Sequence, residues 1–471
     1  MKNINYFLLF TFLAINTIKA ETTWIKVKSG TEFSVGLRSD STLWSWGFNA
    51  NGQLGINSTT TQDEPVQIGT DSDWIDIATG GLHCLAIKSN GTLWAWGVNS
   101  NGQLGDNSTT QSNIPIQIGT DSNWMVVEAG MLHSLAMKTD STIWGWGLNA
   151  QGQLGLGNTT DALVPSQVGT GSSWIKISAG GLHSLAIRND GTLWAWGNNT
   201  GGQLGNNTTT QENSPVMIGA NTNWSDIAAG YSFSLGRKSD NTLFTWGFNA
   251  NGQLGNGTTT QQNAPIQIGT DNNWTKIAAG SSFSFGIKSD STLYGWGFNG
   301  FGQLGTGDIL QKTSPFQIGT DHDWVYVSAS DGFVFNNNLY GYHSAALKRD
   351  RNVICAAGSN AGGQLGNGTT DNSNVFNCST GLLTNVGISS IQPELSNILF
   401  YPNPTNGLLH ISAGNYEKTS VKVFDLFGAL VLSKDINQED FTIDLLNYSK
   451  GIYFVAVERG NIIRKEKIIV Y

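Results

Sequence analysis

Charged residues, cysteines and long apolar runs are all scarce in this 471-residue chain. Only 13% of the residues are charged, and 34 acidic side chains against 25 basic ones give a net charge of −9. Phosphate binding needs a basic face, so we predict no nucleic-acid partner. Three cysteines are too few for a disulfide scaffold. After the first 20 residues no apolar run approaches bilayer length, so we expect no membrane span in the mature chain.

The first 20 residues have the features of a secretory signal. Lys2 gives a short positive region, residues 6–15 are apolar, and Ala20 is a small residue before a plausible cleavage site. An N-terminal membrane anchor is the alternative, although the apolar stretch is short for a bilayer. We predict a signal peptide at residues 1–20 and a secreted or surface-exposed mature protein.

Tryptophan, by contrast, is abundant, and a fifty-residue repeat accounts for all 17 copies. Trp24 opens the first repeat and Trp324 opens the seventh. The sequence Gly-Gln-Leu-Gly recurs in the same register from Gly52, but its seventh copy begins at Gly363, eleven residues late. The seventh repeat therefore contains an insertion, at residues 330–342. Because every Trp falls at one of three repeat positions, we interpret these residues as core packing.

Each repeat is predicted to form four short strands. In the fourth repeat these are residues 174–178, 183–188, 192–196 and 215–218, in which apolar and polar residues alternate with period two. Asp190-Gly191 is a tight-turn pair between the second and third strands. Seven units of four strands without any helical period predict an all-β chain that begins with a seven-bladed β-propeller.

The repeat resembles the regulator of chromosome condensation repeat. The residues that carry the resemblance in the fourth repeat are Ala-Gly-Gly-Leu-His-Ser-Leu-Ala at 179–186, Trp-Ala-Trp-Gly at 194–197 and Gly-Gln-Leu-Gly at 202–205. The resemblance extends over about residues 22–380 and implies a seven-bladed propeller, which we assign to residues 21–380. Nucleotide exchange, the activity of the eukaryotic founder, does not suit a secreted chain that meets no GTPase.

The composition changes near residue 381. No Trp follows Trp324, and charged residues become more frequent. Glycine and proline between residues 381 and 394 indicate a linker. Residues 395–471 form a second domain, with alternating strand patterns at 421–425, 429–433, 441–445 and 452–457.

This second domain resembles the type IX secretion sorting domain of the Bacteroidetes. The residues that carry the resemblance are Tyr-Pro-Asn-Pro-Thr-Asn-Gly at 401–407, Gly-Ile-Tyr-Phe-Val at 451–455 and Lys-Ile-Ile-Val at 467–470. The resemblance implies a small immunoglobulin-like β-sandwich that is recognised by the type IX secretion machinery. It also implies export across the outer membrane to the cell surface or the medium, frequently with removal of the domain.

Candidate catalytic and metal-binding residues fall at repeat positions. One position holds either His or Phe: His83, His133, His183, His343, Phe33, Phe233 and Phe283. A position that accepts either ring is a packing position. Asp71 and Asp73 could suggest calcium, but the equivalent residues 171–173 contain no carboxylate, and calcium needs six or more oxygens. We predict no catalytic residue, no metal site and no cofactor.

The cysteines do not follow the repeat. Cys84 stands where other repeats have Ser, and we expect it to be a buried thiol. Cys355 and Cys378 both lie in the seventh repeat. An oxidising export route allows these two to form a disulfide, and two free thiols are the alternative.

Two features break the symmetry of the propeller and are candidate partner-binding sites. The insertion carries Phe333, Phe335, Tyr340 and Tyr342, and exposed loop aromatics often contact partners. The alternative is a self-packed loop that covers the seam between the last and first blades.

The second feature is a variable, mostly apolar position after the third strand of each repeat, occupied by Phe48, Val98, Leu148, Asn198, Phe248 and Phe298. In a four-stranded antiparallel blade, the connections after strands one and three emerge on the same face. Both candidates therefore share a face, although packing between blades is the alternative for these side chains.

We therefore predict a monomeric, secreted or cell-surface, non-enzymatic propeller that binds a protein or a surface glycan through one loop face. A secreted protein inhibitor of an enzyme and a hydrolase with an unrecognised site are the alternatives.

Overall fold

The computed structural model describes residues 22–330, 333–335, 338–340, 342–379, 399–401, 405–412, 419–425, 430–436, 438, 440–459 and 462–470. The predicted signal peptide, the predicted linker and residues 402–404 of the sorting motif lie outside this part. The chain divides into two compact units between Leu382 and Leu383, inside the predicted linker.

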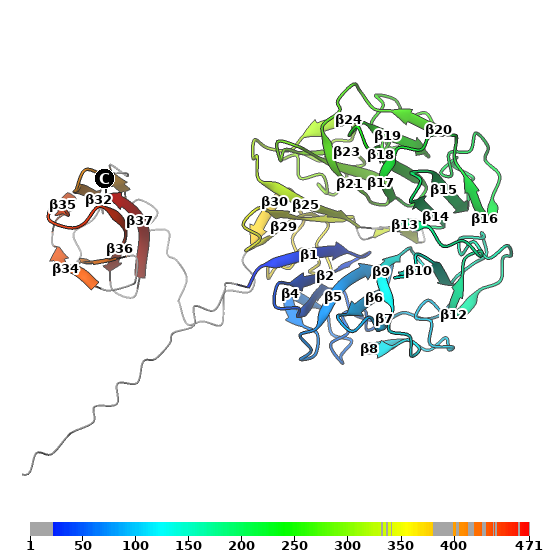
Figure 1. Ribbon diagram of the computed structural model, residues 1–471, viewed down its shortest axis with the longest axis horizontal. Helices are drawn as coiled ribbons and strands as arrows, with labels where there is room; N and C mark the ends of the chain where they lie inside the picture. Colours follow the sequence, from blue (N-terminus) through cyan, green and yellow to red (C-terminus); the bar gives the residue numbers. More distant parts are fainter. Residues whose placement is uncertain are drawn as a thin grey trace, which may run out of the picture. The chain divides into compact units, whose positions relative to one another are not determined.

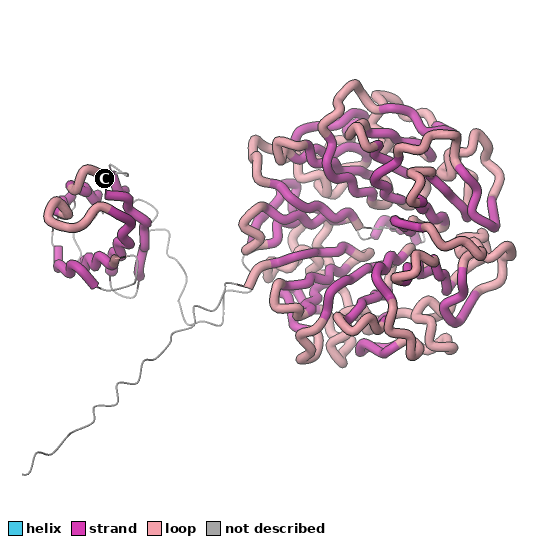
Figure 2. Tube along the Cα trace, viewed as in Figure 1, coloured by secondary structure: helices cyan, strands magenta, loops and turns pink. Residues whose placement is uncertain are grey.

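The first unit is a propeller of seven four-stranded antiparallel blades (Figure 1), and the prediction of an all-β chain is confirmed. Its described residues are strands joined by loops in Figure 2. Its blades consist, in chain order, of β1 (Trp24–Ser29), β2 (Phe33–Arg38), β3 (Leu43–Gly47) and β4 (Gln62–Gln67); β5 (Trp74–Thr79), β6 (His83–Lys88), β7 (Leu93–Gly97) and β8 (Ser112–Gln117); β9 (Trp124–Ala129), β10 (His133–Lys138), β11 (Ile143–Gly147) and β12 (Ala162–Gln167); β13 (Trp174–Ala179), β14 (His183–Arg188), β15 (Leu193–Gly197) and β16 (Glu212–Met217); β17 (Trp224–Ala229), β18 (Phe233–Lys238), β19 (Leu243–Gly247) and β20 (Gln262–Gln267); β21 (Trp274–Ala279), β22 (Phe283–Lys288), β23 (Leu293–Gly297) and β24 (Lys312–Gln317); β25 (Trp324–Ala329), β28 (His343–Lys348), β29 (Ile354–Gly358) and β30 (Ser373–Ser379).

The first strands of the seven blades form a closed inner ring, because each of them contacts the first strand of the next blade. The fourth strand of each blade lies at the outer edge. In the fourth blade this outer strand begins at Glu212, three residues before the predicted start. Glu212 pairs with Gly197 across an irregularity in the register, which the alternation of side chains does not reveal.

Each blade is held to the next by the Gly-Gln-Leu-Gly loop. The Gln103 carbonyl of the second blade accepts the Trp146 Nε1–H of the third blade at 2.9 Å and the Ser134 hydroxyl at 2.7 Å. The Nε2 atom of His83 lies 2.9 Å from Ser134 Oγ. Gly105 has φ +82°, and a Cβ there would lie 2.8 Å from Trp146 Nε1, so the loop needs glycine at this point. The repeated Trp, Gln, Ser and His thus join blades.

The same contacts close the ring. Trp46 Nε1–H of the first blade donates to the Gln364 carbonyl of the seventh blade at 3.0 Å, and the Ser34 hydroxyl donates to it at 3.1 Å. His343 Nε2 lies 2.9 Å from Ser34 Oγ. The seam between the last and first blades therefore matches the other boundaries.

The second unit consists of a three-stranded sheet, β31–β32–β35, and a four-stranded sheet, β34–β33–β36–β37. Buried side chains of both sheets, among them Leu409, Ile443, Val423 and Val455, form one hydrophobic cluster, which makes the unit a small β-sandwich. Its strands are β31 (Leu399–Tyr401), β32 (Leu408–Ser412), β33 (Thr419–Phe424), β34 (Leu430–Ile436), β35 (Asp440–Asp444), β36 (Gly451–Arg459) and β37 (Ile462–Val470).

Candidate functional site

The connectors that follow the first and third strands of each blade lie together, as predicted. They are residues 30–32 and 48–61 in the first blade and the equivalent residues in the others, and we call the surface they form the loop face. In the first blade the Phe48 N–H donates to the Glu32 carbonyl at 2.8 Å, and the second blade has the same bond from Val98 to Leu82 at 2.9 Å. The two kinds of connector are thus joined by backbone bonds.

A buried asparagine shapes the longer connector of each blade. Asn49 accepts the Leu54 N–H through Oδ1 at 3.0 Å and donates through Nδ2 to the carbonyls of Ser58 and Thr60. It satisfies backbone groups that the loop would otherwise leave unpaired. The connector is therefore well defined, and the side chain just before the asparagine is held at a fixed place on the loop face.

The residues of the predicted variable position all remain partly accessible on this face. Phe48, Val98 and Leu148 are half-buried, and Phe248 is 40% exposed. Phe298 is more enclosed, because it packs against Phe301 and Tyr342 with ring centroids 6.2 and 5.2 Å away. The position therefore presents apolar groups in several blades, while one member belongs to an aromatic cluster.

The insertion forms a short hairpin between the first two strands of the seventh blade. Strand β26 (Phe333–Phe335) pairs with β27 (Asn338–Tyr340); the side chains of Phe333, Phe335 and Tyr340 lie outside the described part of the structure. Tyr342 is only 3% exposed and stacks on Phe301 with the ring centroids 5.6 Å apart. The expectation that Tyr342 is a solvent-exposed contact is wrong, because its ring fills the space between the sixth and seventh blades.

The loop face also holds residues that the sequence analysis did not select. Met131 and Tyr231 follow the first strands of their blades and are partly exposed. Glu32 lies in the equivalent connector, and partial burial raises its pKa. Position 131 holds Thr, Gly, Ser, Met or Tyr in different repeats. The same blade-to-blade variation that singled out Phe48 could have revealed it.

The repeated histidines are structural. His83, His133 and His183 are fully buried, so no substrate can reach them. The Ser134 hydroxyl gives its single proton to the Gln103 carbonyl, so His83 must donate through Nε2–H, and its Nδ1 has no partner among the described residues. Burial lowers the pKa of each of these three histidines to about 3. They stay neutral and hydrogen-bond to serine hydroxyls of the next blade.

The acidic pairs that could suggest calcium contact a lysine instead. Lys88 Nζ lies 2.7 Å from Asp71 and 3.2 Å from Asp73. The same ammonium lies 4.8 and 4.7 Å from the ring centroids of Trp74 and Trp94. A cation at this position stacks on the first-strand tryptophan in every blade. No group of three or more metal-binding side chains occurs among the described residues.

Two cysteines of the seventh blade are cross-strand neighbours. Cys355 of β29 lies opposite Cys378 of β30, and a disulfide joins them. Cys84 is a free, buried thiol, and burial raises its pKa. The last blade therefore carries a covalent link between its two outer strands.

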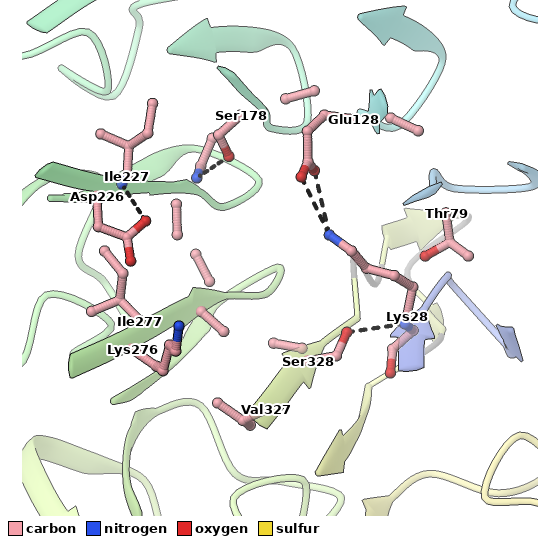
Figure 3. Close-up of a pocket in the computed structure, with 18 of the residues that line it drawn as sticks. Lys28, Thr79, Glu128, Ser178, Asp226, Ile227, Lys276, Ile277, Val327 and Ser328 are labelled. Carbon is pink, nitrogen blue, oxygen red and sulfur yellow. Dashed lines mark hydrogen bonds and ion pairs between the residues drawn. The ribbon is translucent and has the colours of Figure 1, made fainter. Parts of the chain in front are cut away.

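A cavity of about 280 Å³ lies inside the ring of first strands, and all seven of these strands contribute to its lining. We call it the central channel. Figure 3 shows that lysine, glutamate, aspartate and serine side chains point into it. Sequence reasoning missed these residues. The available signal was a strand position that reads Lys26, Asp76, Val126, Lys176, Asp226, Lys276 and Tyr326 in an otherwise regular repeat.

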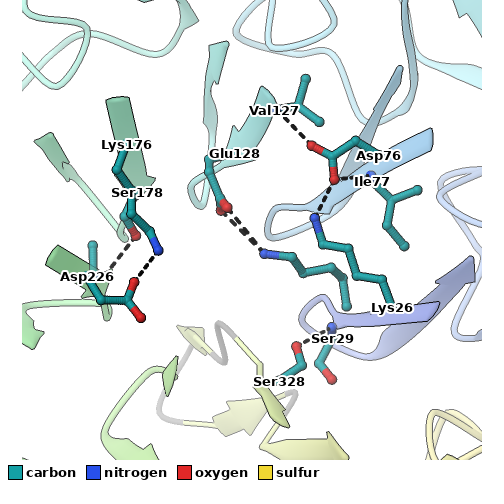
Figure 4. A network of polar contacts seen from close by, with 12 residues as sticks. Lys26, Ser29, Asp76, Ile77, Val127, Glu128, Lys176, Ser178, Asp226 and Ser328 are labelled. Carbon is teal, nitrogen blue, oxygen red and sulfur yellow. Dashed lines mark hydrogen bonds and ion pairs between the residues drawn. The ribbon is translucent and has the colours of Figure 1, made fainter. Parts of the chain in front are cut away.

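Ion pairs between blades occupy part of the channel (Figure 4). Lys26 Nζ lies 2.5 Å from Asp76, and Lys176 pairs with Asp226 in the same way three blades further on. Lys28 reaches Glu128 at 3.4 Å across the second blade. Burial acts to lower the pKa of Lys28, but Glu128, helped by Tyr326 and Asp76, outweighs it, so the pKa is raised.

Comparison with known proteins agrees with this architecture. Residues 13–274 match the model of the RCC1-like domain, and residues 274–303 and 290–335 match the regulator of chromosome condensation (RCC1) repeat. The chain belongs to the RCC1-like domain family. Its propeller is similar in fold to yeast RCC1 (Prp20), with a TM-score of 0.62 and 21% identity over 77% of this chain and 85% of that one. Human WBSCR16 gives a TM-score of 0.60 and 23% identity over 65% and 84%.

Residues 399–471 match the secretion system C-terminal sorting domain. This domain directs type IX secretion, so the RCC1-like propeller is exported to the cell surface or the extracellular space. No helix that could span a membrane occurs among the described residues. The chain also matches Ulvan lyase NLR42 of Nonlabens ulvanivorans at 29% identity over 103 residues, which is 21% of this chain. The match spans only 19% of the lyase.

Proposed function

We propose that this exported RCC1-like propeller is a non-catalytic binding module whose loop face holds a partner protein. The observation that carries the proposal is that the loop face varies from blade to blade on a frame that is otherwise repeated. Buried positions keep one residue or exchange it for another of similar shape, as the invariant Asn49 and its equivalents and the His or Phe position show. Variation at Phe48, Val98, Leu148 and Phe248 is therefore free to serve recognition.

The chemistry of the loop face suits a protein. Half-buried apolar side chains on a rigid frame can become fully desolvated against a partner, and such residues dominate the energy of protein interfaces. Phe248, with 40% of its surface exposed, is the most exposed of them and is the anchor we propose. The hairpin of β26 and β27 follows a first strand, so Phe333, Phe335 and Tyr340 belong to the same proposed contact.

Two other roles use the same surface. A surface glycan is the alternative occupant, and the partial match to a polysaccharide lyase is the reason to test it. A secreted inhibitor would dock one enzyme through the loop face at a fixed ratio. Catalysis by the repeated histidines does not fit, because these side chains are buried and neutral.

Capture experiments with the full chain test the proposal. The purified protein is immobilised, exposed to native culture medium or surface extract, and any captured protein is identified, purified and titrated. Phe48→Ser combined with Phe248→Ser should weaken its binding by at least about tenfold, the scale of a lost interface anchor. Ile175→Ser is the matched control, because Ile175 is 53% exposed but lies at the opposite end of its strand from the loop face.

Equal weakening by the control, or none by the double variant, would reject the loop face. A further variant with Phe333, Phe335 and Tyr340 changed to Ser decides whether the hairpin takes part. Loss of capture after treatment of the extract with polysaccharide-degrading enzymes, but not with protease, would favour the glycan.

A further inference from the structure

The central channel contains one lysine that its neighbours do not neutralise. Lys26, Lys28 and Lys176 each contact a carboxylate of another blade. Lys276 occupies the equivalent place on β21 and lines the channel, and within the described part of the chain no side chain pairs with its ammonium group. Its neighbour in the next blade is Tyr326, where the other lysines of this strand position meet an aspartate.

The channel consequently carries an excess of positive charge. Its four lysines face three carboxylates, those of Asp76, Glu128 and Asp226, and Asp226 also lies 4.0 Å from Arg237 of its own blade, so positive charge is in excess. This contrasts with the net charge of −9 of the chain as a whole. A solute that enters the channel meets a local potential opposite in sign to that of the protein surface.

Three serine hydroxyls of the channel can donate to an anion. Ser178 Oγ accepts the Ala229 N–H at 3.0 Å and Ser328 Oγ accepts the Ser29 N–H at 3.1 Å, which leaves their own protons available. Ser29 also lines the cavity; the residue is 4% exposed, and its hydroxyl oxygen is buried and has no hydrogen-bond partner among the described residues. Buried hydroxyls without a partner are rare, because leaving one unpaired is unfavourable.

The cavity is large enough for a small organic molecule. Its volume of about 280 Å³ is several times the share of about 30 Å³ that one water occupies in the liquid. Polar side chains, small alanines and the aliphatic side chains of Ile177, Ile227, Ile277 and Val327 line it. The lining thus offers a cation, hydroxyl donors and room, and contains no exposed aromatic platform other than Tyr326.

We propose that the central channel is a binding site for a small monoanionic carboxylate, held by Lys276 and by the hydroxyls of Ser328 and Ser29 on the two following blades. A carboxylate matches the unpaired ammonium of Lys276, and its two oxygens can accept bonds from both that ammonium and a hydroxyl. This site does not depend on the loop face or on its partner. Its ligand is a solute, whereas the loop face is proposed to contact a macromolecule.

The test is calorimetric titration of the full chain at low ionic strength, where screening of the channel charge is weakest. The probes are acetate, lactate and glucuronate, with glucose as the uncharged counterpart of glucuronate. We expect at least one carboxylate to bind at a ratio of one to one, glucose not to bind, and the affinity to fall as salt is added.

Two variants locate the binding in the channel. Lys276→Gln should weaken binding by about tenfold or more, because it removes the surplus charge. Ser29→Ala breaks no hydrogen bond of the described structure, so it should leave folding intact and weaken binding by a smaller factor. Lys434→Gln, on the exposed part of β34 in the other unit, is the matched control and should bind like the parent.

Absence of binding by all three carboxylates would overturn the proposal. So would equal binding of glucose and glucuronate, or an affinity unchanged in both Lys276→Gln and Ser29→Ala. Thermal unfolding of each variant beside the parent shows that a loss of binding is not a loss of structure.

Discussion

Acid should destabilise the propeller through its buried histidines, and His133→Phe tests this most directly. His133 Nε2 lies 3.1 Å from Ser184 Oγ of the next blade, and the Ser184 hydroxyl donates to the Gln153 carbonyl at 2.8 Å. Phenylalanine already fills this position in other blades. Beside Phe233, the Ser284 hydroxyl keeps its bond to the Gln253 carbonyl without a histidine. The substitution is therefore expected to fit.

The size of the effect follows from the pKa of His133. Burial lowers it from 6.5 to about 3, so the folded state resists protonation that the unfolded state accepts. The free energy of unfolding is therefore unaffected by His133 above pH 6.5, and it decreases as the pH falls from 6.5 toward 3. Between about pH 7 and pH 5 the loss is about 2 kcal/mol for one such histidine, and about 6 kcal/mol for His83, His133 and His183 together.

Denaturant titration followed by tryptophan fluorescence gives the measurement. All 17 Trp lie at or before Trp324, so the signal reports the propeller unit and not the sorting domain. At pH 7 the parent and His133→Phe should differ by about 1 kcal/mol or less, since one hydrogen bond is exchanged for a buried apolar ring. At pH 5 the variant should be the more stable by about 1 to 2 kcal/mol.

The same loss of stability from pH 7 to pH 5 in parent and variant would refute this reasoning. It would mean that His133 is protonated in the folded propeller or that acid unfolding is governed by the carboxylates. The triple variant His83→Phe, His133→Phe and His183→Phe provides the larger signal, and its pH dependence should be the flattest of the three proteins.

Three further predictions follow from the blade contacts and the cysteines. Gly105→Ala should lower the free energy of unfolding by about 2 kcal/mol or more, because alanine is strained at positive φ and its Cβ would meet Trp146; thermal unfolding checks this. Trp146→Phe should destabilise by about 1 to 3 kcal/mol, because it leaves a buried carbonyl without one of its donors, and an unchanged melting temperature would contradict the assigned bond. Thiol titration of the unreduced protein should detect no reactive thiol in the native state and one thiol, that of Cys84, in denaturant. Reduction should add the thiols of Cys355 and Cys378. It should also destabilise the seventh blade by about 2 to 4 kcal/mol.

Much of the fold could be predicted because the repeat is a local property. The spacing from Trp24 to Trp324 counts the blades, and the late Gly363 places the insertion between two specific strands. The loop face also followed from the strand count alone, since connectors after odd strands of an antiparallel blade must emerge together. The prediction that Phe48 and its equivalents, just before the buried asparagine, lie on the loop face therefore agrees with the structure.

The environment of single side chains was harder to predict. Tyr342 was expected in the solvent because it ends an insertion, yet it stacks on Phe301 of the preceding blade. Neither the length nor the composition of the insertion indicates that the Phe301 ring lies beside Tyr342. The channel lysines were missed for a similar reason. A register irregularity between Trp24 and Lys26 sets which side chains of the inner strand face the channel, and simple alternation does not report it.

The sequence by itself determined that this protein is a seven-bladed propeller with an export domain, because blade number, strand length and turn position are encoded within each fifty-residue unit. Only the tertiary structure decided which residues meet across blades. Trp46 binds the carbonyl of Gln364, 318 positions away, and Lys28 pairs with Glu128 across a whole blade. Such contacts exist only once the ring has closed, because closure brings together charges and ring faces that no local pattern relates. Lys276 stands out for that reason: its lack of a partner is visible only when all seven inner strands surround it.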